Sequence, residues 1–262
     1  GIKFKSTQFE TKVYENNKPM LALNYSDFSV SLFLQSTIGD ALAIGTGVQF
    51  EGIDLSQDVT ATAEDDTYQN YLNYYAFLDF DSFNRANYPT SGTKTSVSAR
   101  VITEKDSISG FRDPGSVIDF SFAQAIKITN QISLIPSVKG IFTIGQDLDY
   151  AYNIFLGSMG KNYINYITPF IGYQYMELPG RNTIVVRADA NFQIFKNHYI
   201  IAKANWGKLE KSFQETIDSD IIFDGYSIGY SYDSIIGPLE LSVTGSTNHS
   251  SVYTYISLGF WF

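Results

Sequence analysis

Residues 182–195 read NTIVVRADANFQIF, and apolar and polar side chains alternate along the whole stretch. The apolar positions of one face are Ile184, Val186, Ala188, Ala190, Phe192 and Ile194. The opposite face carries one apolar side chain, Val185, and four polar ones, Arg187, Asp189, Asn191 and Gln193. Because successive side chains of a strand point to opposite faces, this period of two predicts a long β-strand with one apolar and one polar face.

The same period recurs from one end of the chain to the other, whereas helical spacing is hard to find. It predicts twelve strands, at residues 3–15, 19–37, 41–56, 68–84, 92–105, 115–129, 131–145, 182–195, 198–209, 222–234, 237–248 and 252–262. In the second strand the apolar positions shift register between Tyr25 and Phe28. This shift indicates either a β-bulge or a tight turn at Ser26-Asp27. A turn there would make thirteen strands, which a closed antiparallel sheet disfavours.

The length of these strands points to a membrane. Strands of soluble sandwiches have about five or six residues, whereas a tilted membrane strand needs about nine to eleven. The polar face, rich in Gly, Ser, Asn and paired charges, suits a barrel interior. Aromatic side chains such as Tyr74, Tyr199 and Trp206 crowd strand ends, where interfacial girdles lie. We therefore predict an all-β, antiparallel transmembrane β-barrel, with a soluble all-β fold as the alternative.

Loop lengths predict the orientation of this barrel. Connections alternate between short turns and long polar loops, the longest being 146–181. Short turns on one side and long loops on the other are typical of outer-membrane barrels, whose short turns are periplasmic. With twelve strands both termini then lie in the periplasm. We expect residues 1–262 to form a single barrel domain, with the extracellular loop 146–181 folded into the lumen.

The composition excludes several classes of protein. The formal net charge is −9, with 27 acidic against 18 basic residues, so a nucleic-acid partner is not expected. The chain has no cysteine, which excludes disulfide scaffolds, zinc fingers and thiol catalysis. No run of about eighteen apolar residues could form a transmembrane helix. The beginning of the chain lacks an export signal, so we interpret it as a mature protein.

Two short motifs and one long loop resemble those of the outer membrane protein 85 superfamily, also called bacterial surface antigens, and the C-terminus resembles a general outer-membrane signal. The stretch Tyr88-Pro89-Thr90-Ser91-Gly92 is similar to the family's Tyr-Pro-Thr-x-Gly periplasmic turn. Gly237-Pro238-Leu239 resembles the start of its penultimate strand. The terminal residues Leu258, Phe260 and Phe262 look like the signal that the outer-membrane assembly machinery reads. The loop 146–181 also takes the place of the family's long sixth extracellular loop.

The chain departs from the family at two sites. The family's long loop carries Val-Arg-Gly-Phe, whose Arg is held inside the barrel by an acidic group of a nearby strand. Here Phe170, Ile171, Gly172 and Tyr173 take that place, with Ile171 at the Arg position. The family's Phe-x-Asp-x-Gly on the partner strand corresponds to a stretch with Asn205 and Gly207, so Asn replaces Asp. Both halves of the ion pair are therefore absent, which resembles the barrels of patatin-like phospholipases more than the insertases.

The chain is also shorter than the family's usual barrels of sixteen strands, and it has no POTRA-like βαβ pattern. We expect a short member of the family without such domains; a fragment of a longer chain, with more strands, is the alternative.

No residue pattern predicts catalysis, a metal site or a cofactor. His198 and His249 belong to opposite ends of the barrel, and neither is paired with a Ser as hydrolase chemistry requires. The acidic clusters Glu64-Asp65-Asp66 and Asp147 with Asp149 could bind cations, but we expect them to be solvated charged loops. Inward charges are expected to pair across the lumen, although a channel lining would use the same residues.

The resemblance implies a role in protein or lipid translocation or insertion at the outer membrane. The alternatives are a passive, porin-like channel and the anchoring barrel of a patatin-like phospholipase. The expected partners are outer-membrane lipids including lipopolysaccharide, and the assembly machinery during biogenesis. A homodimer is a further possibility, because the first strand, 3–15, alternates poorly and could pair with a second copy.

Overall fold

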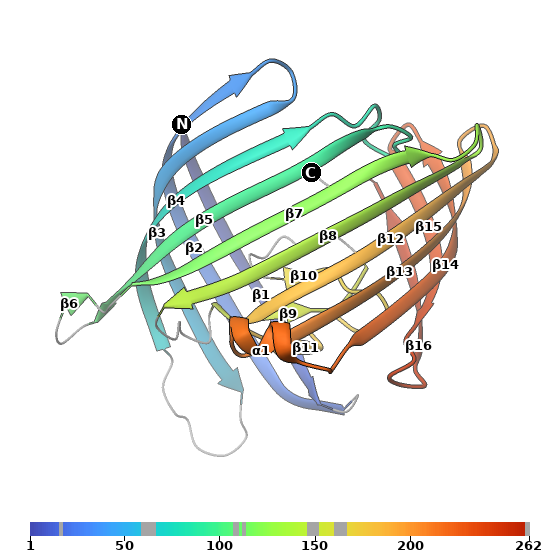
Figure 1. The fold of residues 1–262 in the computed structure, drawn as a ribbon. Coiled ribbons are helices and arrows are strands. Elements are labelled where there is room, and N and C mark those ends of the chain that lie inside the picture. The colour runs from blue at the N-terminus through green and yellow to red at the C-terminus, as the bar shows by residue number, and fades with distance from the viewer. Residues whose placement is uncertain are drawn as a thin grey trace.

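The computed structural model describes residues 1–15, 18–58, 67–106, 110–111, 114–145, 152–159 and 167–259. Twelve long strands form one antiparallel ladder, in which each strand pairs with the next along the chain (Figure 1). They are β1 (Ile2–Glu15), β2 (Lys18–Ile38), β3 (Leu42–Asp58), β4 (Thr67–Asp81), β5 (Gly92–Asp106), β7 (Gly115–Lys127), β8 (Ile132–Gly145), β12 (Asn182–Phe195), β13 (His198–Glu210), β14 (Phe223–Ser234), β15 (Gly237–Gly245) and β16 (Val252–Leu258). This ladder confirms the predicted all-β, antiparallel, twelve-stranded architecture.

Four short strands and one helix complete the described structure. β6 (Gly110–Phe111) pairs with β5. β9 (Ile154–Leu156), β10 (Ile167–Thr168) and β11 (Leu178–Gly180) form a separate small sheet in the order β10-β9-β11. The helix α1 (Phe213–Asp218) begins with a capping box between Ser212 and Glu215. Among the described residues, no helix is long and apolar enough to cross a membrane.

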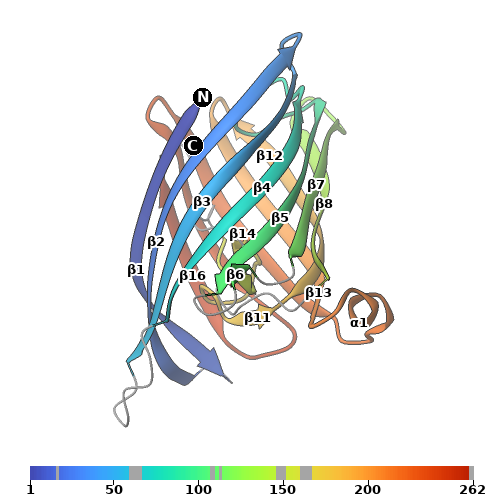
Figure 2. The same ribbon diagram turned by 90° about the vertical axis from the view of Figure 1, so that its left-hand side faces the viewer.

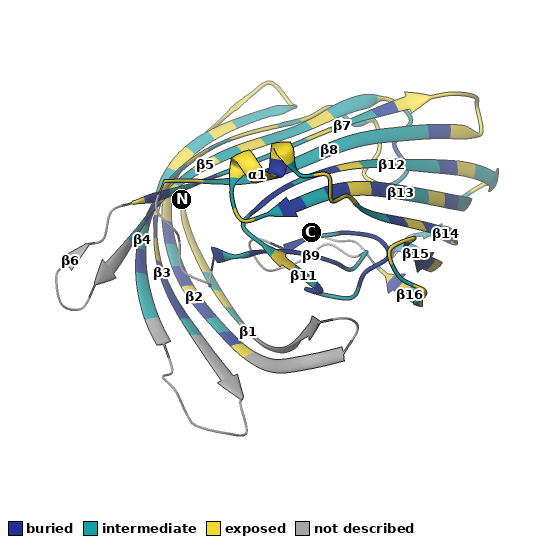
Figure 3. Cartoon of the chain, turned by 60° about the horizontal axis from the view of Figure 1, so that its bottom comes forward, coloured by how far each residue is buried: buried dark blue, intermediate teal, exposed yellow. Residues whose placement is uncertain are grey.

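The long sheet curls around the small one. Figure 2 shows β1 to β5 side by side and tilted, and Figure 3 shows β9 and β11 on the concave side of the curled sheet. We call this concave side the inner face. The edge strands of the ladder are β1 and β16, and within the described part of the chain no ladder joins them. The periplasmic position of the termini stays a prediction.

The two faces of the strands differ as the alternation predicts. Val186, Ile228 and Leu241 lie on the outer face, with exposed fractions of 50%, 63% and 50%. On the same strand as Val186, the side chains of Arg187 and Asp189 lie on the inner face and form an ion pair. An apolar outer face and a polar inner face are what a transmembrane barrel requires.

The expected irregularity of β2 at Tyr25 to Phe28 is wrong. β2 pairs with β1 and β3 without a shift through these residues, so neither a bulge nor a turn breaks the strand. The apolar pattern changes there because Tyr25 lies on the inner face, where it packs in a core with Ile53 and Tyr71. The register shift of this hairpin lies instead between Val13 and Tyr14.

Several strands end earlier than the alternation predicts, β4 and β15 among them. The alternation predicts that β4 reaches residue 84, but the strand ends at Asp81, where side chains organise the following turn. There, Thr93 N donates to Ser82 Oγ at 2.9 Å and Thr90 N to Asn84 Oδ1 at 3.0 Å. Likewise, β15 ends at Gly245 rather than 248, and Thr247 Oγ1 donates to Asp224 Oδ1 at 2.8 Å.

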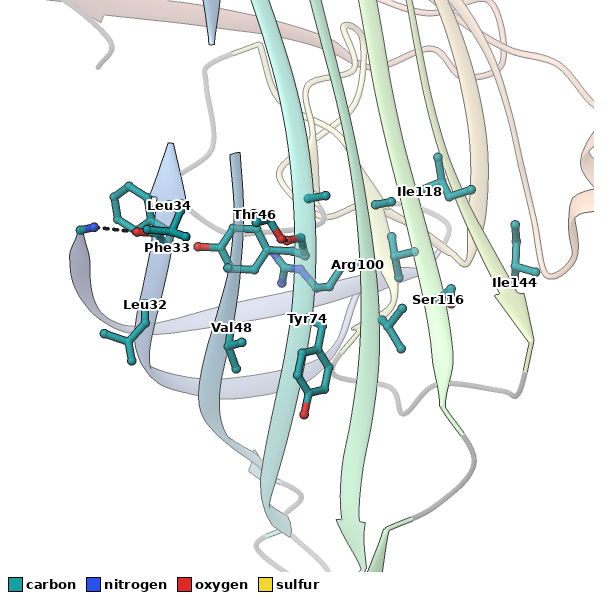
Figure 4. A pocket seen from close by; sticks show the side chains of 17 residues that line it. Leu32, Phe33, Leu34, Thr46, Val48, Tyr74, Arg100, Ser116, Ile118 and Ile144 are labelled. Carbon is teal, nitrogen blue, oxygen red and sulfur yellow. Dashed lines mark hydrogen bonds between the residues drawn. The ribbon is translucent and has the colours of Figure 1, made fainter. Parts of the chain in front are cut away.

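A hollow of about 960 Å³ lies on the outer face of β2 to β8 (Figure 4). Its floor is made of the small side chains Thr46, Ala76 and Ala99, which are cross-strand neighbours on β3, β4 and β5. Larger side chains such as Val48 and Tyr74 rise beside them. In a transmembrane barrel, a hollow on the outer face would meet lipid acyl chains.

Candidate functional site

Residues 152–159 and 167–180, which we call the inner segment, fold against the inner face of the long sheet. The segment carries the small sheet of β9, β10 and β11. Its side chains Leu156, Phe170 and Ile171 have exposed fractions of 0%. Such complete burial in a connection between two barrel strands marks the segment as the part of the molecule where function is best sought.

The residues at the family's loop motif contact those at its partner-strand motif. Ile171 N donates a hydrogen bond of 2.7 Å to Asn205 Oδ1 on β13, and Asn205 is fully buried. A Cβ atom added to Gly207 would lie 2.8 Å from the ring of Phe170. The structure therefore brings Phe170, Ile171, Asn205 and Gly207 together. A neutral hydrogen bond and the contact of an aromatic ring with a glycine thus stand where the resemblance implies an ion pair.

Glycines on the neighbouring strands allow this close approach. A Cβ atom on Gly225 of β14 would lie 1.7 Å from Ile171 O. Gly172 has a φ of +93°, and its own Cβ would lie 2.6 Å from Gly245 O. Any side chain at Gly225 would displace the inner segment, and Gly172 needs its positive φ as well. The close approach at Gly225 and Gly245 was not predicted; for Gly225, the spacing of Gly225 and Gly229 in one strand was a signal in the sequence.

Tyr173 completes this contact on the side of β14 and β15. Its hydroxyl and that of Ser246 are 3.2 Å apart and share a hydrogen bond. Its ring meets the rings of Phe223 and His249 edge to face, with centroids 6.1 and 5.0 Å away. His249 is thus a packing partner of the inner segment.

The inner segment also contacts strands at the other end of the ladder. Tyr152 Oη donates to Glu51 Oε2 of β3 at 2.8 Å, and Asn73 Nδ2 of β4 donates to the same oxygen at 2.8 Å. Gln174 Nε2 donates a hydrogen bond of 3.3 Å to the hydroxyl oxygen of Tyr253 on β16. The segment therefore spans the space between β3 and β16.

Charges on the inner face pair along the wall. Arg187 and Asp189 pair within β12, with Nε and Oδ1 2.6 Å apart. The other pairs join nearby strands: Lys203 with Glu240 at 2.7 Å, and Lys139 with Asp119 at 3.7 Å. These three pairs therefore run along the wall, whereas the expectation was that they pair across the lumen.

No metal site is evident in the described residues, where three or more His, Cys, Asp or Glu side chains nowhere form a suitable group. The acidic residues 64–66, 147 and 149 lie outside the described residues.

The turn of residues 82–91, between β4 and β5, reaches β13 and β14. The ring of Tyr88 stacks on that of Tyr199, with centroids 4.1 Å apart and planes at 16°. The Tyr88 hydroxyl also shares a hydrogen bond with Ser231. Pro89 is buried. Gly92 has a φ of +104°, and a Cβ atom added to it would lie only 2.1 Å from Ser82 O. The predicted turn motif thus holds two distant parts of the ladder together.

The predicted assembly signal is only partly described. Leu258 ends β16 on the outer face, with an exposed fraction of 61%. Phe260 and Phe262 lie outside the described residues.

Three solved structures share the fold of this chain. BamA from Haemophilus ducreyi lacking POTRA domains 1–3 has a TM-score of 0.67 at 11% identity, covering 90% of this chain and 53% of that chain. CdiB from Acinetobacter baumannii has a TM-score of 0.67 at 10% identity, covering 98% and 46%. CdiB from Escherichia coli has a TM-score of 0.61 at 12% identity, covering 99% and 50%.

These likenesses show the fold alone, and the chain spans about half the length of the solved chains it matches. No curated protein matches it. The family match, in contrast, extends over residues 1–262 and is to the OMP85 superfamily. The chain therefore belongs to the OMP85 superfamily, as an integral β-barrel protein of the bacterial outer membrane.

Proposed function

We propose that this barrel translocates or inserts protein or lipid at the outer membrane, and that the inner segment is a plug that must shift when it works. The observation that carries the proposal is the span of the inner segment, which contacts Glu51 on β3, Asn205 on β13 and Tyr253 on β16. A passive diffusion channel needs an open lumen, whereas here buried side chains occupy the concave side of the sheet.

The type of contact supports a plug that can move. Its bond to Asn205 joins a main-chain N–H to a neutral amide, and each such hydrogen bond contributes only about 0.5–1.5 kcal/mol. Breaking a buried ion pair would cost about 3–5 kcal/mol, because it leaves an unpaired charge. Replacement of the family's Arg and Asp by Ile171 and Asn205 therefore lowers the cost of displacing the segment.

Membership of the OMP85 superfamily supports protein or lipid as the cargo, and the choice between them calls for two parallel assays. The full chain would be reconstituted in liposomes. Protein insertion would be followed as protease protection of an unfolded client barrel, and lipid movement as dithionite quenching of a fluorescent lipid. Faster kinetics than in empty liposomes, in either assay, would support the proposal. Rates equal to those of empty liposomes in both assays would refute it.

The same proposal implies partners. We infer that Leu258 and the terminal phenylalanines are read by the assembly machinery during biogenesis. The expected contacts with lipopolysaccharide and with a second copy stay predictions.

A further inference from the structure

A pocket of about 210 Å³ lies between the inner segment and the wall formed by β5, β7, β8 and β12. Thr168 and Pro169 of the inner segment cover one side. The wall side is lined by Lys94, Ser121, Phe122, Ala123, Ser137, Val138, Lys139, Val185 and Arg187. Liquid water occupies about 30 Å³ per molecule, so the pocket has room for about seven water molecules. It could instead hold one compact polar group together with a smaller number of waters.

Among the described residues, the lining contains three cationic side chains and no carboxylate. Each cation has a carboxylate partner outside the lining, but these partners leave donors unused. Lys139 Nζ is 3.7 Å from Asp119, which is beyond hydrogen-bond distance. Arg187 donates to Asp189 through Nε and Nη2, which leaves three of the five N–H groups of a guanidinium for another acceptor. The pocket therefore offers positive charge together with free donors.

Thr168 adds a polar group from the inner segment. The residue is 2% exposed, and its hydroxyl is buried without a hydrogen-bond partner in the described structure. A buried, unpaired hydroxyl is unfavourable, so its position at this pocket calls for an acceptor. Ser121 and Ser137 bring two more hydroxyls on the wall side.

We propose that this pocket binds a phosphate group, which bridges Thr168 of the inner segment to Lys139 and Arg187 of the wall. A tetrahedral anion with several oxygens matches cations and hydroxyls that converge from both sides, and hydrogen bonds between charged groups are the strong ones. The phosphate comes either from solution or from a lipid headgroup. Lys94, whose side chain is 55% exposed, marks the side from which the group enters. The pocket does not depend on the cargo of the barrel.

Binding of inorganic phosphate to the full chain, refolded in detergent, would test this site. Titration calorimetry at constant ionic strength, with chloride as the balancing anion, would measure the affinity. We expect saturable binding, weakened about tenfold or more by Lys139→Gln, since a hydrogen bond to a charged group is worth about 1.5–3 kcal/mol. Thr168→Val, which keeps every charge, should weaken it at least about threefold. The matched control Lys127→Gln removes a charge on β7 that does not line the pocket and should leave the affinity unchanged.

Heat-modifiable electrophoretic mobility would show that each variant is folded. A parallel titration with glycerol phosphate would distinguish the source: tighter binding than inorganic phosphate indicates a headgroup, and weaker binding indicates the free anion. Absence of saturable binding would overturn the site. If Lys139→Gln and Lys127→Gln weakened phosphate binding equally, the binding would reflect general electrostatic attraction, and the proposed site would be overturned too. Unchanged affinity in Thr168→Val would overturn the bridge to the inner segment.

Discussion

The main-chain nitrogen of Ile171 donates a hydrogen bond of 2.7 Å to Oδ1 of Asn205, two residues separated by 34 positions in the chain. This bond joins the inner segment to β13 at the place where relatives are expected to have an Arg–Asp pair. Because one partner is a peptide N–H, the contact fixes the path of the main chain whatever side chain stands at position 171. It therefore anchors the segment without a buried charge.

Removal of the acceptor should loosen this anchor. In Asn205→Ala the buried N–H of Ile171 loses its partner, which costs about 1–3 kcal/mol. We expect a lower free energy of unfolding in urea titrations in liposomes, together with faster protease cleavage within 152–180. Ser227→Ala is the matched control, since its hydroxyl lies on the inner face of β14 and has no hydrogen-bond partner among the described residues. Equal behaviour of the two variants would contradict the role of Asn205.

The glycine at 225 provides a steric test of the same contact. In Gly225→Ala the new methyl group would lie 1.7 Å from Ile171 O, so the main chain of the inner segment must move. We expect the barrel to refold with the segment displaced. The chain has no cysteine, so a single Cys introduced at Ser158 would report this displacement. Faster labelling of that Cys by a maleimide in Gly225→Ala than in Ser227→Ala would be the expected result, and equal rates would speak against close packing.

The wall could be predicted from the sequence because the alternation of Ile184, Arg187 and their neighbours is local. The contacts of the inner segment could not, because Gly225 and Ile171 meet only after the sheet has curled. The resemblance located Ile171 and Asn205 but indicated only a lost ion pair, since a main-chain donor has no sequence signature. The wrong prediction of a bulge or turn at Tyr25 has a related reason. An aromatic residue in a strand is compatible with either face until the residues that it packs against are known.

The 82–91 turn predicts a pH dependence. Burial raises the pKa of Tyr88 to about 12, although the hydrogen bond with Ser231 acts in the opposite direction. The unfolded chain has the ordinary value near 10, so it releases this proton first, and the stabilising effect of Tyr88 is complete below pH 10 and lost from about pH 10 to 12. Tyr88→Phe keeps the ring stacking on Tyr199 but cannot titrate.

The free energy of unfolding of the natural protein, measured relative to Tyr88→Phe, should be constant up to about pH 9 and then fall. Other tyrosines titrate in both proteins and cancel in the difference. A difference that stays flat to pH 12 would show that the Tyr88 contacts are not made in solution.

A charged side chain on the outer face should destabilise the barrel, because that face is expected to contact lipid. Val186 is 50% exposed on the outer face of β12, so Val186→Arg should destabilise the barrel by about 2–4 kcal/mol if the residue lies near the midplane. Val186→Leu, at the same position, should change stability by less than about 1.5 kcal/mol. Urea titrations in liposomes would give both values, and a similar small effect of the two changes would refute the lipid-facing assignment.

Single-channel recording in planar bilayers tests the plug most directly. The comparison is between the full chain and a variant that lacks residues 160–176, which include Phe170, Ile171 and Tyr173. If the inner segment closes the barrel, the full chain should be electrically silent and the deletion variant should show steady conductance. Large, steady currents from the full chain, unchanged by the deletion, would contradict the account and indicate an open channel.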